Sequence, residues 1–149
     1  MTIRWQNIGT LSGIFTLASM CLTFATMVTI TLFSVDGNLY FIVYPDRYGW
    51  QILYAPMLFV VFVWSTILFV GVIMGNEMAG RIGKLKCLIG NGIAIALLIV
   101  TGVLLVNYSS KASRWSDGRF KTRFIFGCIF SWITFLLYLA EFVVTLVWK

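Results

Sequence analysis

The chain contains four long stretches of apolar residues, and this pattern constrains its fold more than any other feature. The stretches run over residues 8–33, 51–75, 85–106 and 124–148. A helix needs roughly 20 mostly apolar residues to cross the hydrocarbon core of a membrane, and each stretch meets that length. Transmembrane strands are shorter and alternate strictly between apolar and polar residues, which these stretches do not. The sequence therefore predicts an all-α membrane protein with four spans in a single domain, residues 1–149.

The composition excludes most soluble functions. Hydrophobic residues make up 60% of the chain and charged residues 11%, whereas soluble domains are about 45–50% apolar and about 25% charged. The chain has no histidine, which is the commonest general base and metal ligand. It also lacks a phosphate-binding glycine motif. We therefore expect no enzymatic activity, no metal site, no cofactor and no nucleic-acid partner, and we regard bound lipid or cholesterol as the candidate small ligands.

Small and weakly polar side chains recur along three of the spans at helical spacing. Lipid is as apolar as leucine, so membrane helices associate through close packing of small residues and through hydrogen bonds between helices. The stripes predict a compact, left-handed four-helix transmembrane bundle with short loops, in which they form the packing seams. The seam residues are Ser12, Ser19 and Thr23 in the first span, Gly90 and Ala94 in the third, and Gly127, Ser131 and Thr134 in the fourth.

Glu141 is the one ionisable residue deep within a span. An acidic side chain at the bilayer centre costs about 2.5–3.5 kcal/mol on insertion scales, so it is expected to face the bundle interior. Counting residues from the span ends predicts an intramembrane polar layer of Glu141, Asn91 and Thr16, with Tyr138 one turn away. Two interpretations stay open: a hydrogen-bonding group that fixes helix register, which we favour, and a proton or cation site.

The loops between spans one and two and between spans three and four lie on the same side of the membrane and are called the outer loops. In the first, Asp36, Gly37 and Asn38 are typical of a turn, and residues 39–44 are typical of a short strand or hairpin. Aromatic residues of these loops are candidate contacts for a partner protein. The candidates are Tyr40, Phe41, Tyr44 and Trp115. An interfacial aromatic belt is the alternative, and both can hold at once; its residues would be Tyr40, Tyr44, Tyr48, Trp50 and Tyr54.

Two further features concern modification and orientation. Cys87 follows Lys84 and Lys86 at a span end and is a candidate for palmitoylation; the alternative, which we favour, is a small residue buried between helices. An even number of spans places both termini on one side. Arg4 before the first span and Asp36 after it favour a cytoplasmic side for the termini.

The last span resembles the final helix of MARVEL-domain proteins, most closely the branch of the myelin and lymphocyte protein and plasmolipin. The resemblance rests on Phe126, Leu137-Tyr138, Glu141-Phe142-Val143 and Leu146-Val147-Trp148-Lys149, and on Gly49-Trp50 before the second span. It implies a non-enzymatic bundle with cytoplasmic termini, in the plasma membrane or endomembrane vesicles. Such a bundle organises membranes in vesicle trafficking, membrane domains or cell junctions.

The expected partners are membrane lipids and other membrane proteins, in a hetero-complex or a homo-oligomer. Two alternatives remain open at this point. The chain could be an accessory transmembrane subunit of a channel, a transporter or a respiratory assembly. Less favoured is a small transporter or channel that uses Glu141.

Overall fold

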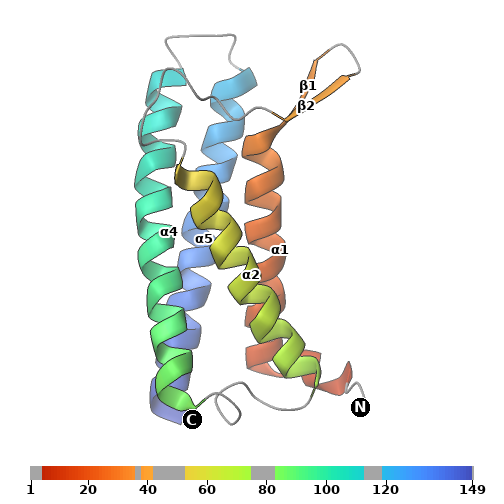
Figure 1. The fold of residues 1–149 in the computed structure, drawn as a ribbon, viewed down its shortest axis with the longest axis vertical. Helices are drawn as coiled ribbons and strands as arrows, with labels where there is room; N and C mark the ends of the chain where they lie inside the picture. The colour runs from red at the N-terminus through yellow and green to blue at the C-terminus, as the bar shows by residue number, and fades with distance from the viewer. Residues whose placement is uncertain (1–4, 36–37, 42–52, 75–82, 113–118, 149) are drawn as a thin grey trace.

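The computed structural model describes residues 5–35, 38–41, 53–74, 83–112 and 119–148 (Figure 1). These residues form the long helices α1 (Leu11–Thr31), α2 (Tyr54–Ile73), α4 (Lys84–Ala112) and α5 (Arg119–Trp148). A 3-10 helix, η1 (Trp5–Gly9), precedes α1, and a hairpin of strands β1 (Leu32–Val35) and β2 (Asn38–Phe41) follows it. The four long helices are each long and apolar enough to cross a membrane. The predicted four-helix bundle of an integral, multi-pass membrane protein is thus confirmed.

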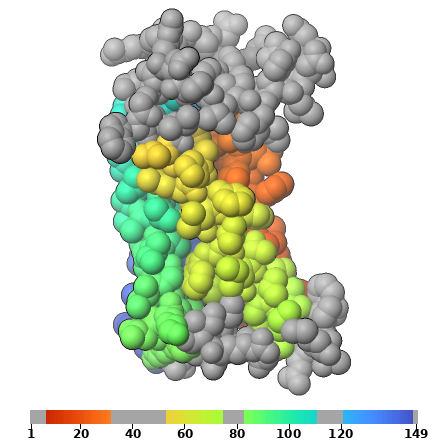
Figure 2. All heavy atoms as spheres, viewed as in Figure 1, coloured from red at the N-terminus to blue at the C-terminus, as the bar shows by residue number. Residues whose placement is uncertain are grey.

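The helices run alternately up and down, so the bundle has two distinct ends (Figure 1). We call the end at which α1 begins and α5 ends the termini end, and the opposite end the hairpin end. Helix α5 packs against α1 and α4, and α2 packs against the same two helices. Helix α2 crosses the bundle obliquely, from beside α4 at the hairpin end to beside η1 at the termini end (Figure 1). There the Asn7 amide Nδ2 donates to the Val72 carbonyl over 3.1 Å. Figure 2 shows the side chains of α2 and α4 in contact along this face.

Helix α1 begins later and ends earlier than predicted. The Thr10 hydroxyl accepts a hydrogen bond from the Gly13 amide over 3.2 Å, and the Thr10 carbonyl accepts one from Ile14 over 2.9 Å. Thr10 is therefore the N-cap, and Ile8, the predicted start, belongs to η1. A Cβ at Gly13 would overlap the backbone of Asn7 and Ile8, so the return of the chain from η1 into α1 requires glycine.

The first strand of the hairpin begins with two residues, Leu32 and Phe33, that the sequence assigned to the first span. Phe33 was the predicted end of that span, but α1 ends at Thr31. Strand β1 follows and pairs antiparallel with β2, with Leu32 opposite Phe41 and Val35 opposite Asn38. The predicted strand of residues 39–44 overlaps β2, while residues 42–44 lie outside the described part of the chain. The predicted turn residues Asp36 and Gly37 also lie outside it.

Helices α4 and α5 extend further toward the hairpin end than the predicted spans 85–106 and 124–148. Aromatic packing stabilises α4 beyond its predicted end. Tyr108 of α4 stacks on Phe124 of α5 with ring centroids 5.0 Å apart, and Tyr54 of α2 meets Tyr108 edge-on at 5.8 Å. Asn107-Tyr108-Ser109, which has the form of a glycosylation sequon, therefore lies within α4.

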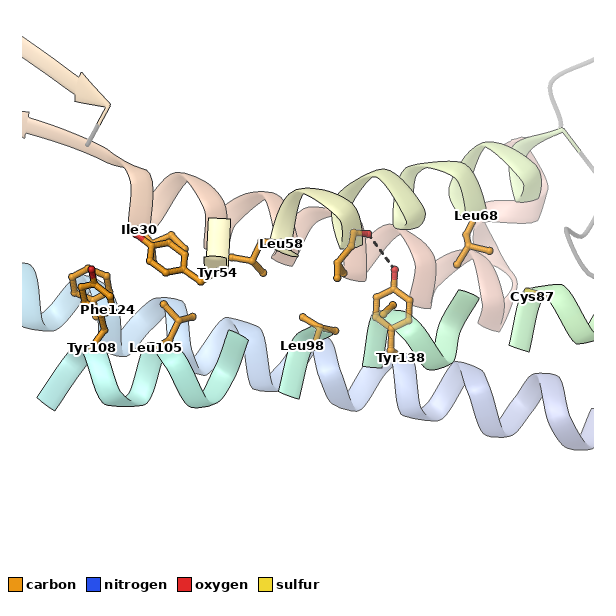
Figure 3. Packing of buried hydrophobic residues seen from close by; sticks show 12 residues of the cluster. Ile30, Tyr54, Leu58, Leu68, Cys87, Leu98, Leu105, Tyr108, Phe124 and Tyr138 are labelled. Atoms are coloured by element: carbon orange, nitrogen blue, oxygen red, sulfur yellow. Dashed lines mark hydrogen bonds between the residues drawn. The ribbon is translucent and has the colours of Figure 1, made fainter. Parts of the chain in front are cut away.

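The bundle interior combines apolar and polar side chains. Helices α2 and α4 contribute large apolar residues, among them Leu58, Leu98 and Leu105 (Figure 3). Helices α1 and α5 contribute mainly hydroxyl groups. The buried polar residues are Thr16, Ser19, Thr23, Thr26, Thr31, Ser65, Asn91, Thr101, Ser131, Thr134, Glu141 and Thr145. Seams of small side chains therefore hold α1 against α5, whereas leucines fill the opposite half of the bundle.

Candidate functional site

The candidate site is a set of buried polar residues that comes from all four long helices. We call it the polar layer, and it comprises Thr16 of α1, Ser65 of α2, Asn91 of α4, and Tyr138 and Glu141 of α5. Glu141 is 6% exposed, and the other members are more deeply buried. The four residues predicted from the sequence all belong to this set, and none of them faces the lipid.

Tyr138 links α5 to α2 across the bundle. Its hydroxyl lies 2.6 Å from Ser65 Oγ and 3.5 Å from the Val61 carbonyl oxygen (Figure 3 shows the latter contact). Ser65 Oγ in turn donates to the Val61 carbonyl over 2.9 Å. Because the serine proton is engaged there, the Tyr138 hydroxyl is the donor to Ser65 Oγ. The phenol is thus held at a fixed depth, which also fixes the register of α5 against α2.

Asn91 is oriented by its neighbour on α2. The Trp64 indole Nε1 donates to Asn91 Oδ1 over 2.9 Å. The indole ring lies over Gly90, where a Cβ would come within 2.5 Å of Trp64 Cη2. An indole nitrogen is a donor only, so it selects the carbonyl oxygen of the amide and turns the amide nitrogen of Asn91 away from Trp64.

The helix registers place Asn91, Glu141 and Thr16 at one depth. Moving 17 residues back along α4 from Tyr108 reaches Asn91, and moving 17 residues forward along α5 from its stacking partner Phe124 reaches Glu141. A similar count starts at Gly127, whose Cβ would lie 2.6 Å from Cγ2 of Ile30. Moving 14 residues forward along α5 reaches Glu141, and moving 14 back along α1 from Ile30 reaches Thr16. At a fixed rise per residue, equal counts along antiparallel helices end at equal depth.

The predicted seam residues are mostly buried. Ser12 and Gly90 are half-buried, and the buried ones are Ser19, Thr23, Ala94, Gly127, Ser131 and Thr134. Several hydroxyls of the seam bond to their own helix. Thr23 donates to the Ser19 carbonyl over 2.6 Å, and Thr134 donates to the Phe130 carbonyl over 2.8 Å. The seam between α1 and α5 thus depends on close approach of the helices more than on hydrogen bonds between them.

The burial of Cys87 favours the packing interpretation of this residue over its prediction as a palmitoylation site. The residue is 6% exposed and belongs to the apolar cluster between the helices. An acyltransferase needs access to the thiol, and this thiol faces the core. The alternative interpretation from the sequence, a small residue packed between helices, agrees with this position.

The candidate outer-loop contacts are less fully described. Tyr40 and Phe41 lie on β2, on a hairpin that projects beyond the helices (Figure 1). Tyr44 and Trp115 lie outside the described residues. Their contact role stays a prediction.

Sequence analysis missed two residues that hold the polar layer together, Trp64 and Ser65. The neighbouring Thr66 is half-buried and donates to its own helix at the Phe62 carbonyl over 2.8 Å. Helix α2 is apolar on every side, so its sequence carries no stripe that marks the inward face. The one sequence feature that indicates the inward face of α2 is Ser65, the lone serine in an apolar span.

Within the described ranges, no group of three Cys, Asp or Glu side chains lies close enough together to hold a metal ion. Comparisons of the chain with family models, curated proteins and solved structures find no match. The polar layer can fix the register of the helices through its hydrogen bonds. It can also present the carboxyl group of Glu141 to a small polar molecule inside the bundle.

Proposed function

We propose that the protein is a non-enzymatic organiser of membranes, which acts through its helix faces and outer loops in vesicle trafficking, membrane domains or cell junctions. The proposal rests on the resemblance of the last span to MARVEL-domain proteins and on one structural observation. The bundle turns its polar groups inward and large apolar side chains outward on all four helices, for example Phe24, Phe59, Val103 and Leu136. A surface of this kind is suited to contacts with lipids and other membrane helices.

The hairpin adds a second point of contact. Strands β1 and β2 extend beyond the lipid-crossing helices, and β2 carries Tyr40 and Phe41 (Figure 1). Aromatic residues on a short strand pair are suited to pairing with an extended segment of another protein. In this proposal the helix faces associate laterally, the hairpin contacts the partner, and the termini are cytoplasmic.

The test is a purification in mild detergent from the native membrane, with the bound proteins identified and quantified. We expect several membrane proteins of one vesicle or junction compartment at variable ratios, and their loss when residues 39–44 are replaced by a Gly-Ser segment. A fixed ratio to one large channel, transporter or respiratory complex would contradict the proposal and favour an accessory subunit.

A matched pair of variants tests the third interpretation, transport. In this proposal Glu141→Gln keeps the partners and the fold, and neither it nor the native protein conducts ions in liposomes. Flux through the native protein that is abolished in a folded Glu141→Gln variant would instead assign a transport role to the carboxyl group.

A further inference from the structure

Three of the buried polar atoms that have no hydrogen-bond partner among the described residues are Ser19 Oγ, Asn91 Nδ2 and Ser131 Oγ. Each of these side chains is at most 1% exposed. A buried polar group without a partner costs about 1–3 kcal/mol. Native interiors avoid this cost almost everywhere, commonly by binding an ordered water molecule. The three atoms therefore indicate that small polar molecules, such as water, bind inside the bundle.

Of the three side chains, Asn91 restricts the chemistry of its bound molecule most closely. Its Oδ1 is engaged by the Trp64 indole, so the amide cannot turn around without losing that 2.9 Å hydrogen bond. Its Nδ2 is consequently a donor directed away from Trp64, and it requires an acceptor. A metal cation is unsuited to this position because the group offered is an N–H and not an oxygen.

A candidate for the second partner of the water lies at the same depth. The register through Tyr108 and Phe124 places Glu141 of α5 at the depth of Asn91 of α4. A carboxyl group has about four lone-pair positions, so Glu141 accepts a further hydrogen bond whatever other contact it makes. A water molecule between the two would accept from the Asn91 amide and donate to the Glu141 carboxyl. It would thereby have two of the two to four polar partners that a buried water needs.

We propose that the bundle binds a structural water molecule between Asn91 and Glu141, and that further internal waters bind Ser19 and Ser131 along the α1–α5 seam. These two serines differ from their threonine neighbours, whose hydroxyls bond to carbonyls of their own helix. The inference does not depend on the proposed membrane-organising role.

The experiment is water-edited solid-state NMR of the full chain in lipid bilayers, with Asn, Glu and Ser isotopically labelled. We expect magnetisation to pass from water to the Asn91 side-chain amide and to the Cβ of Ser19 and Ser131. The Leu98 methyl groups, which are buried among apolar neighbours, are the negative control. Absence of transfer to the Asn91 amide overturns the proposal.

Two variants test the partner of the water. Glu141→Gln keeps a hydrogen-bonding group and is expected to keep the Asn91 signal, whereas Glu141→Leu is expected to lose it. Persistence of the signal in Glu141→Leu overturns the pairing with Glu141. A measurement on the native chain covers the case in which Glu141→Leu does not fold. Dipolar recoupling between Asn91 Nδ2 and Glu141 Cδ is expected to give a separation longer than that of a direct hydrogen bond, and a direct-contact separation overturns the proposal.

Discussion

Replacing Gly90 by alanine tests whether the Trp64–Asn91 contact holds α2 against α4. The new Cβ would lie 2.5 Å from Trp64 Cη2 and 2.7 Å from Cε2. Carbon atoms pack at about 3.5–4.0 Å, so the indole ring must move by about 1 Å or more. That movement pulls Nε1 away from Asn91 Oδ1, a buried acceptor that then loses its donor. Steric crowding and loss of the hydrogen bond therefore act together.

The magnitude follows from three contributions. Overpacking costs about 1–3 kcal/mol, and a buried acceptor left without its donor costs about 1–3 kcal/mol. Alanine favours the helix over glycine by about 1 kcal/mol. The net expectation is a destabilisation of about 3 kcal/mol, or more than about 100-fold in the unfolding equilibrium.

Gly92 provides the matched control, because it lies on the same helix, is also half-buried, and a Cβ there meets no atom within 4 Å. We expect Gly92→Ala to be neutral or stabilising by up to about 1 kcal/mol. The assay is reversible unfolding in mixed micelles of increasing SDS fraction, followed by helical circular dichroism. The indole N–H resonance of Trp64 reports the hydrogen bond separately. Equal stability of the Gly90→Ala and Gly92→Ala variants, with an unchanged Trp64 resonance, would refute the reasoning.

Three further outcomes are expected. Tyr138→Phe removes the donor to Ser65 and lowers stability by about 0.5–1.5 kcal/mol in the same titration, because Ser65 keeps its bond to Val61; a loss of several kcal/mol would contradict this account. Thr10→Ala removes the N-cap of α1 and costs about 1 kcal/mol, whereas Thr10→Ser keeps it; equal losses in the two variants would exclude the capping role. Cys87 carries no acyl group by acyl-biotin exchange and reacts with maleimide only after denaturation; labelling of the folded protein would contradict its burial.

Periodicity predicted the inward face of the helices where that face differs chemically from the others. On α1, residues such as Thr16, Ser19 and Thr23 stand out against leucine and isoleucine, and all three are buried. Counting residues from the span ends placed Asn91 and Glu141 at the same depth, because a helix converts residue number into distance at a nearly constant rate. The bundle and the core of the polar layer follow from these two rules.

The remaining features depend on tertiary contacts that leave no local pattern. Helix α2 is apolar on nearly all sides, so nothing in its sequence distinguishes Ser65, which is buried and meets Tyr138, from Thr66, which is half-buried; both donate to carbonyls of their own helix. The run Leu32–Val35 has a composition that suits a helix and a strand equally, and pairing with β2 decides between them. The extension of α4 past residue 106 depends on Tyr108, which the sequence places near a loop and the structure stacks on Phe124.

The hydroxyls that bond within their own helix also bear on how the protein is made. A helix such as α1, whose Thr16, Thr23 and Thr26 donate to carbonyls one turn back, leaves few polar groups unsatisfied when it sits alone in lipid. Helices α4 and α5 differ, because each carries a larger buried polar side chain, Asn91 or Glu141, that is costly among acyl chains. During biogenesis α1 and α2 can therefore leave the translocon singly, while α4 and α5 gain most by leaving it as a pair.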